Sequence, residues 1–271
     1  MRFNPRRKAA SLLTLIFLTL ALPITYAQAQ IYVKADAGGS NNGSSWDDAY
    51  NELQDALISA TAGDEIWVAA GEYEPDTSSV FFSFVIHAGV ALYGGFNGTE
   101  TARTERDWTT NVTVLDGEIN SPDSTDNTQH VVTCSGGGSD TVLDGFTVRG
   151  GVGDPTTRTA GGMQIENSSV TVANVIFEGN SSWQKGGAVY LDGGSPTFTN
   201  VEFTGNTAGI QIGGTTYPGY GGGMYVLNGS STFHGCTFTA NAALFAGPGG
   251  GVAKYGTGTA TFTDCMFDCC G

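Results

Sequence analysis

The stretch GGAVYLDGGSPTFTNVEFTGN at residues 186–206 decides the fold, because the chain repeats it with limited changes. The next copy, GGMYVLNGSSTFHGCTFTAN, covers residues 222–241. Two further copies begin at Gly161 and Gly250, so four similar units occupy the C-terminal half of the sequence. A unit of this size that recurs along a chain indicates a solenoid, in which each unit stacks on its neighbour.

Apolar residues keep a constant spacing inside each unit. Every copy closes on a Phe that has one apolar residue five positions before it and another two positions before it; these closing residues are Phe177, Phe203, Phe238 and Phe267. Thr alternates with Phe, and Gly, Ser and Val are abundant, which is typical of short strands joined by turns. The spacing therefore predicts an all-β fold, a parallel β-helix whose equivalent residues stack about 4.8 Å apart.

Asn stands three positions after the closing Phe in three of the copies, at Asn180, Asn206 and Asn241, and Cys270 stands there in the fourth. Asn side chains in stacked strands hydrogen-bond to one another, and Asn tolerates a left-handed backbone. We therefore expect an Asn ladder along one turn of the solenoid.

The five cysteines allow more than one interpretation; they are Cys134, Cys236, Cys265, Cys269 and Cys270. Cys236 and Cys265 occupy the same stacked position, where they either fill the core as small apolar residues or bridge adjacent coils. Their spacing does not resemble a zinc site, and the pairing of all five stays open.

Residues 1–29 are typical of a signal peptide for secretion. The segment begins with the basic residues Arg2, Arg6, Arg7 and Lys8, continues with an apolar run from Leu12 to Leu22, and ends with Ala27-Gln28-Ala29 as a cleavage site (Thr25-Tyr26-Ala27 is the rival). No other segment is apolar enough to predict a transmembrane helix in the mature chain.

Acidic residues dominate the charge, with 26 Asp and Glu against 11 Lys and Arg and a formal net charge of −15. Removal of the signal peptide takes away four basic residues and no acidic one, which leaves −19. So negative a chain argues against nucleic acid or an anionic membrane as partner.

A helix is expected at the start of the mature chain, as a cap on the solenoid. Ser45 is a candidate N-cap, and apolar residues recur at helical spacing from Trp46 until Gly63. We expect a single domain over residues 30–271, with this cap at 30–63 and β-coils at 64–271. Because no polar unit follows the last coil, we also expect the chain to be truncated at Gly271.

The early coils contain a repeated pentapeptide. Thr113–Gly117 and Thr141–Gly145 both read TVLDG, which predicts equivalent turns of two successive coils. We expect the strands before them at 65–68, 85–86 and 90–93, with polar loops at 97–111 and 119–129.

The paired glycines and the closing Phe-x-x-Asn resemble the GGAI and FxxN repeats of chlamydial polymorphic membrane proteins. The resemblance covers roughly residues 145–271 and departs from the pattern at Cys270. It implies a surface-exposed autotransporter passenger with an adhesin role.

The N-terminal part resembles large exported bacterial proteins with a right-handed, pectin-lyase-like β-helix. The matching segments are Ile31–Val33, Gly43–Trp46, Asp64–Tyr73 and Gly89–Phe96. This resemblance implies a right-handed β-helix and export to the cell surface, the outer membrane or the medium, with any membrane anchor beyond Gly271.

The sequence offers few catalytic residues. Arg149 follows an alternating strand and is either a catalytic base or, as we favour, a solvated surface residue. Asp116 and Asp144 hold the same place in the pentapeptide, so calcium is a candidate ligand, although Asp-Gly at a turn is the favoured interpretation. No motif supports a cofactor, and we assign no catalytic or metal-binding residue.

Aromatic residues in the variable loops are better candidates for ligand contact. An insertion between Asn206 and Gly221 contains Tyr217 and Tyr220, and the neighbouring coils have Trp183 and Phe245 at equivalent places. Such residues either stack on a sugar ring or a partner protein, or fold back over the coil.

These observations predict an exported cell-surface or extracellular β-helix protein that binds a glycan or a surface protein without catalysis. The alternatives are a polysaccharide lyase or glycoside hydrolase, and a structural surface-layer component. An Arg-plus-carboxylate cluster on one strand face would favour the enzyme.

Overall fold

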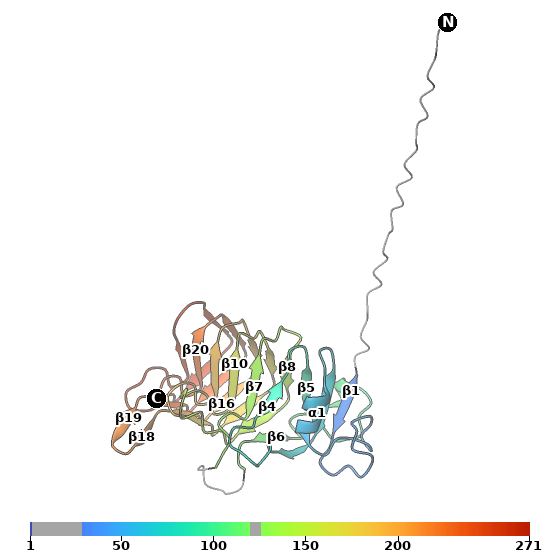
Figure 1. Cartoon of the computed structure of the whole chain (residues 1–271). Helices are drawn as coiled ribbons and strands as arrows, with labels where there is room; N and C mark the ends of the chain where they lie inside the picture. Colours follow the sequence, from blue (N-terminus) through green and yellow to red (C-terminus); the bar gives the residue numbers. More distant parts are fainter. Residues whose placement is uncertain (2–28, 120–125) are drawn as a thin grey trace.

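The computed structural model describes residues 1, 29–119 and 126–271, and the predicted signal peptide lies almost wholly outside this part. Three long sheets of parallel strands run along one solenoid (Figure 1). Each coil passes through the eight-strand sheet, then the seven-strand sheet and then the six-strand sheet, before it returns to the eight-strand sheet. The predicted parallel β-helix is therefore confirmed.

The eight-strand sheet contains, in spatial order, β1 (Gln30–Val33), β2 (Glu65–Ala69), β5 (Ala91–Phe96), β8 (Val142–Asp144), β11 (Thr171–Ala173), β15 (Thr197–Thr199), β21 (Ser231–His234) and β25 (Ala260–Thr263). The seven-strand sheet contains β3 (Gly71–Tyr73), β6 (Thr113–Asp116), β9 (Thr147–Arg149), β12 (Ile176–Glu178), β16 (Glu202–Thr204), β22 (Thr237–Thr239) and β26 (Met266–Asp268). The six-strand sheet contains β4 (Phe84–Ile86), β7 (Val132–Ser135), β10 (Met163–Glu166), β14 (Val189–Asp192), β20 (Met224–Asn228) and β24 (Val252–Lys254).

The chain also contains shorter elements outside these three sheets. A small three-strand sheet contains β13 (Ser181–Ser182), β17 (Thr207–Ala208) and β23 (Ala242–Ala243), and an antiparallel hairpin contains β18 (Ile210–Ile212) and β19 (Thr215–Tyr217). The helical segments are α1 (Leu53–Ser59) and the 3₁₀ helix η1 (Arg103–Glu105).

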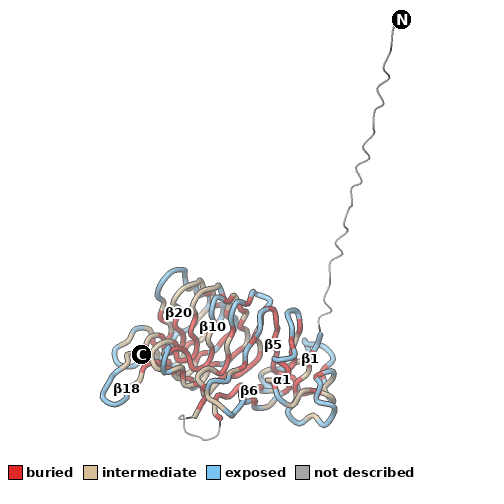
Figure 2. The backbone as a smooth tube through the Cα atoms, in the orientation of Figure 1, coloured by how far each residue is buried: buried red, intermediate tan, exposed pale blue. Residues whose placement is uncertain are grey.

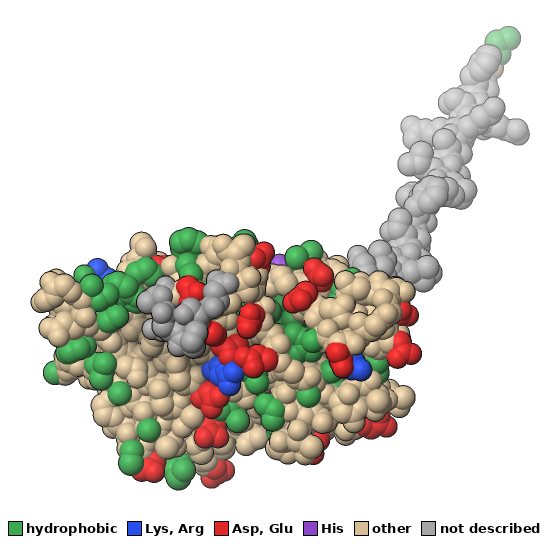
Figure 3. Space-filling view, turned by 90° about the horizontal axis from the view of Figure 1, so that it is seen from below, with side chains coloured by type: hydrophobic (Ala, Val, Ile, Leu, Met, Phe, Trp, Pro, Cys, Tyr) green, Lys and Arg blue, Asp and Glu red, His purple; other side chains and the backbone are tan. Residues whose placement is uncertain are grey.

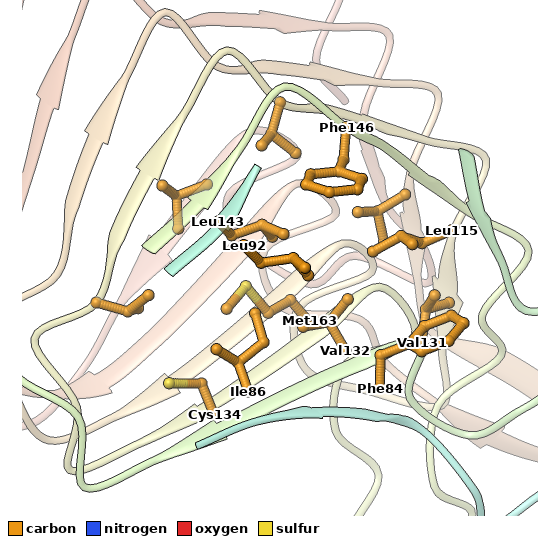
Figure 4. Packing of buried hydrophobic residues seen from close by; sticks show 14 of the residues in the cluster. Phe84, Ile86, Leu92, Leu115, Val131, Val132, Cys134, Leu143, Phe146 and Met163 are labelled. Atoms are coloured by element: carbon orange, nitrogen blue, oxygen red, sulfur yellow. The ribbon is translucent and has the colours of Figure 1, made fainter. Parts of the chain in front are cut away.

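The inward side chains form continuous columns, as the repeat spacing predicts. In the seven-strand sheet the rings of Phe203 and Phe238 stack with centroids 4.5 Å apart, and a second column in the eight-strand sheet pairs Phe198 with Phe233 at 4.9 Å. The core of the earlier coils is mostly aliphatic, with Phe84 and Phe146 packed among these side chains (Figure 4). Buried residues lie along the strands of the coils and exposed residues along the loops (Figure 2), so burial of these columns is the main source of stability.

The predicted Asn ladder is confirmed, and its members are fully buried. The Nδ2 of Asn180 donates to Oδ1 of Asn206 at 3.1 Å, and the Nδ2 of Asn206 donates to Oδ1 of Asn241 at 2.9 Å. The expectation of a left-handed backbone at these residues is wrong. The left-handed position is the residue before each Asn, as at Gly205 and Ala240, because that turn brings the Asn side chain inward.

The helical cap exists but is shorter than expected. Helix α1 begins at Leu53, not at Trp46, because the backbone of Tyr50 pairs with β1 as a strand does, through Tyr50 N to Tyr32 O and Lys34 N to Tyr50 O. Ser45 caps only a turn, where its Oγ accepts from Asp48 N. The buried face of α1 still packs on the first coils, as a cap requires.

The two TVLDG segments are not equivalent, contrary to the prediction. Thr113–Asp116 is a strand of the seven-strand sheet, whereas Val142–Asp144 belongs to the eight-strand sheet. Position in a coil is set by which strand each segment pairs with, and β6 pairs with β9 while β8 pairs with β5 and β11. Asp116 and Asp144 therefore lie on different sheets, and the proposed shared calcium register is wrong.

All five cysteines are free thiols, so the disulfide alternative for Cys236 and Cys265 is wrong here. Cys236 is fully buried and continues the inward column of Val201, which is the packing role that the repeat allowed. In the described part of the chain, no helix has both the length and the apolar character needed to cross a membrane.

Candidate functional site

The insertion after Asn206 forms a hairpin that projects from the solenoid near its C-terminal end (Figure 1). Strands β18 and β19 pair antiparallel around Gly213-Gly214, whose φ angles are +57° and +82°. Two successive residues with positive φ suit the tight turn that matches the twist of a hairpin, and Gly adopts them without steric cost. The sequence of the loop therefore builds a defined arm rather than an irregular loop.

Two of the four predicted contact residues meet at this arm. Trp183, in the preceding coil, and Tyr217, at the end of β19, are half-buried with ring centroids 5.9 Å apart. The Arg158 guanidinium lies over the Tyr217 ring at 4.7 Å. The two rings and the guanidinium hold one another in place, so the Trp183 ring is positioned by its surroundings.

A groove of about 460 Å³ lies between the hairpin and the preceding loops. We call it the hairpin groove. Its apolar lining comes from Val80, Val152, Pro155, Trp183, Ile210 and Ile212. Its polar side chains are Asn127, Gln129, Ser181 and Ser182, and no charged residue lines it in the part of the chain that the structure describes. An apolar cleft with a few polar groups is the usual form of a small-ligand site.

Two polar side chains in this lining have an oxygen without a partner. Ser182 is 4% exposed and Asn127 is 6% exposed, and neither Ser182 Oγ nor Asn127 Oδ1 makes a hydrogen bond within the described structure. The amide of Asn127 is fixed, because its Nδ2 donates to Gly150 O at 2.5 Å. A buried polar atom without a partner costs about 1–3 kcal/mol, and a bound ligand removes that cost by pairing with it.

The other two predicted residues lie elsewhere. The Tyr220 ring makes edge contacts with Tyr225 and Tyr255, in an aromatic stack on the outside of the six-strand sheet that also includes Tyr190. Tyr220 thus covers the coil, which was the alternative interpretation of the sequence. Phe245 is 43% exposed in a left-handed turn and does not line the hairpin groove.

An Arg-plus-carboxylate cluster occupies the outer face of the seven-strand sheet. Arg149 Nε contacts Asp116 Oδ2 at 2.6 Å, and its Nη2 contacts Glu72 Oε1 at 2.9 Å. Glu118 and Glu178 line the same shallow hollow. Figure 3, which views the side on which β6 and β16 lie in Figure 1, shows acidic side chains gathered around a basic group. Arg149 is therefore not simply solvated, and this cluster is the feature named above as favouring an enzyme.

The electrostatics of this cluster oppose some catalytic roles. The hydrogen bond from Arg149 to Asp116 raises the pKa of the guanidinium, so Arg149 is harder to deprotonate than an ordinary Arg and is unsuited to act as a base. By contrast, burial and then the neighbouring carboxylates, Asp116 first among them, raise the pKa of Glu74, which suits a general acid. Both carboxylate oxygens of Asp116 already accept a hydrogen bond, Oδ2 from Arg149 Nε and Oδ1 from Glu118 N.

Asp144 belongs to a second, outer ladder that the sequence analysis missed. Arg106 Nη2 donates to Asp144 Oδ2 at 2.7 Å, Asn174 Nδ2 to Asp144 Oδ1 at 2.8 Å, and Asn200 Nδ2 to Asn174 Oδ1 at 2.8 Å. Asn174 and Asn200 adopt positive φ. Their 26-residue spacing equals that of Phe177 and Phe203, a signal that could have identified this ladder.

Metal binding finds no support in this arrangement. Within residues 1, 29–119 and 126–271, no group of three or more His, Cys, Asp or Glu side chains is placed to hold an ion. Asp116 and Asp144, the two candidate calcium ligands, are each paired with a different Arg.

Comparison with solved structures gives two pectin methylesterases. PemA from Erwinia chrysanthemi matches with a TM-score of 0.46 and 13% identity, over 89% of this chain and 67% of that one. The enzyme from Aspergillus niger matches with a TM-score of 0.37 and 17% identity, over 90% and 68%.

The comparison with curated proteins gives no match. The family model described as "Right handed beta helix region" matches residues 125–271, which is more than half of the chain. This match supplies the handedness that the strand order alone leaves unstated. The chain therefore belongs to the right-handed β-helix family.

Proposed function

We propose that this protein is exported and acts at the cell surface or in the medium as an adhesin-like β-helix, which binds a glycan or a surface protein without catalysis. The observation that carries the proposal is the hairpin groove, which Trp183 lines beside two buried, unpaired oxygens while its ring rests against Tyr217. A site that holds a ligand needs this combination of apolar area and unsatisfied polar groups.

Export is supported by the basic start and apolar run of residues 1–29. The surface role is supported by the resemblance of the Gly-Gly and Phe-x-x-Asn units to passenger repeats. The repeated coils themselves support a stalk, because stacked units extend a binding loop away from an attachment point.

The test compares binding by the full chain with binding by two variants. Trp183→Ala removes the ring that lines the hairpin groove, and Ile58→Ala removes an equally apolar side chain that is 72% exposed on helix α1. We expect adhesion to glycans and surface proteins to be lost in Trp183→Ala and kept in Ile58→Ala. Equal adhesion by both variants would contradict the assignment of the hairpin groove as the binding site.

The second candidate function is cleavage of an acidic polysaccharide, and the Arg149 cluster favours it. A lyase or hydrolase needs carboxylates and a cation that converge on one face, as Glu72, Asp116 and Glu118 do around Arg149. Against it stand the raised pKa of Arg149 and the pairing of Asp116 on both oxygens.

Cleavage is measured by incubating the full chain with polygalacturonate and assaying unsaturated products and new reducing ends. We expect neither product from the wild type. Product that disappears in Arg149→Lys and persists in Trp183→Ala would establish the enzyme and displace the binding proposal.

A further inference from the structure

The column of residues that contains Ser182 is otherwise occupied by alanine. Strands β13, β17 and β23 pair in register, so that Ser182, Ala208 and Ala243 occupy the same place in three successive coils. All three side chains are buried, at 4%, 0% and 7% exposed. The fold therefore accepts a methyl group here, and the hydroxyl of Ser182 adds a buried polar atom that the packing does not use.

An unused buried hydroxyl lowers stability relative to alanine, since it gives up its hydrogen bonds to water without replacement. Ser182 lines the hairpin groove together with Asn127, whose Oδ1 is unpaired as well. Two neighbouring coils show that alanine fits, so packing does not explain the serine. A ligand that pairs with both oxygens explains it.

We propose that the hairpin groove binds an uncharged carbohydrate, with a sugar ring against Trp183 and ligand hydroxyls paired to Ser182 Oγ and Asn127 Oδ1; this inference rests on the binding function proposed above. Asn127 Oδ1 only accepts hydrogen bonds, whereas Ser182 Oγ both donates and accepts. A sugar hydroxyl matches both, because it donates and accepts in the same way. Both oxygens have almost no exposed area, so a ligand hydroxyl pairs with them only after the side chains that cover them move aside.

The absence of charge in the groove decides between classes of glycan. Among the described residues that line it, none has a charged side chain, although the chain as a whole carries −15. A uronate or sulfated glycan would find no cation in this lining, because the Arg158 guanidinium beside the groove is held over the Tyr217 ring, and it would enter against the field of the acidic surface. The apolar wall formed by Trp183, Ile210 and Ile212 suits the carbon face of a neutral hexose or pentose.

The experiment titrates the full chain with cellohexaose, xylohexaose, mannohexaose and maltohexaose, and with an oligogalacturonate of the same length. We compare the wild type with Ser182→Ala and with Ser231→Ala. Ser231 is the matched control, because its Oγ is also buried and unpaired but lies in β21, outside the hairpin groove. Both substitutions should leave the melting temperature unchanged or raise it.

We expect at least one neutral oligosaccharide to bind, with an affinity about tenfold weaker in Ser182→Ala, undetectable in Trp183→Ala and unchanged in Ser231→Ala. Equal affinity in Ser182→Ala and wild type would overturn the role of the hydroxyl. Failure of all four neutral sugars at millimolar concentration would overturn the ligand class.

The two proposals fail in different ways. Binding of oligogalacturonate, or of a surface protein, that depends on Trp183 would overturn the neutral-sugar inference and leave the binding function in place. Adhesion that is independent of Trp183, with no sugar bound, would overturn both.

Discussion

Asn206 and Asn241 are joined by a hydrogen bond of 2.9 Å from the Nδ2 of the first to the Oδ1 of the second, inside the solenoid where neither residue is exposed to solvent. Asn206 also donates to Phe177 O at 2.9 Å and accepts from the backbone N of Asn180 at 3.0 Å. One side chain thus satisfies buried backbone groups of one neighbouring coil while bonding to the Asn of the next.

Replacing Asn206 with Ala should lower the free energy of unfolding by about 2 kcal/mol, because it removes the side-chain bond to Phe177 O and leaves Asn180 N buried without a partner. The measurement is denaturant unfolding followed by circular dichroism. The control is Asn200→Gly in the outer ladder, which keeps the positive φ and loses only the bond to Asn174, so it should change stability by less than about 1 kcal/mol. Equal losses for the two variants would contradict the structural role assigned to the buried ladder.

The ladder shows what the sequence determines well. Asn180, Asn206 and Asn241 keep one distance from their closing Phe, and a solenoid converts a constant distance along the chain into a stack in space. The coils, their inward columns and the ladder were predictable for that reason. The handedness came from resemblance to a family, because a repeat spacing is the same for either hand.

Features that depend on contacts between different parts of the chain were not predictable. The strand pairing of Tyr50 shortened the expected helix, and the pairing of β6 and β8 with different strands separated Asp116 from Asp144. The Arg149 cluster joins Glu72 to a residue 77 positions away. Ser182 stands out only after Ala208 and Ala243 are known to share its column.

The substitution Arg149→Met should destabilise the fold by about 2 kcal/mol, because it leaves the Asp116 carboxylate without its charged partner. The Asp116 side chain is only 5% exposed, whereas the 39% exposure of the Arg149 side chain reduces the effect. The matched control is Arg103→Met, whose partner Glu65 also accepts from Trp67 Nε1. We expect a loss of less than about 1 kcal/mol there, measured by urea unfolding. A larger loss in the control would show that burial of the carboxylate does not decide the effect.

Acid should weaken the fold through His130. Burial lowers the pKa of this imidazole below its ordinary 6.5, and its Nδ1 lies 2.5 Å from Ala160 O. The unfolded chain therefore takes up a proton near pH 6.5 before the folded one does, so stability falls as the pH drops from about 6.5 toward the folded pKa. In His130→Asn, which keeps a donor for Ala160 O, unfolding free energies at about pH 7.5 and 5.5 should differ less than in the wild type. An unchanged pH dependence would show that His130 does not contribute.

The thiols should differ in reactivity according to burial. Cys236 is fully buried, and burial raises the pKa of its thiol to about 11, so a disulfide reagent should modify it only after unfolding. Cys269 is exposed, and a hydrogen bond to the Asp268 carboxylate raises the pKa of its thiol. Asp268→Asn should therefore speed the modification of Cys269, followed by mass spectrometry of the labelled peptides. Rapid labelling of Cys236 in the folded chain would contradict the packing described here.

Hydrogen–deuterium exchange of the full chain, with and without the neutral oligosaccharide that binds most tightly, tests the central claim most directly, because it locates the bound ligand without a substitution. We predict slower exchange in residues 181–183 and 209–217, which border the hairpin groove. Protection confined to β9 and β12, beside Arg149, would contradict the account and place the ligand on the face that the enzymatic alternative requires.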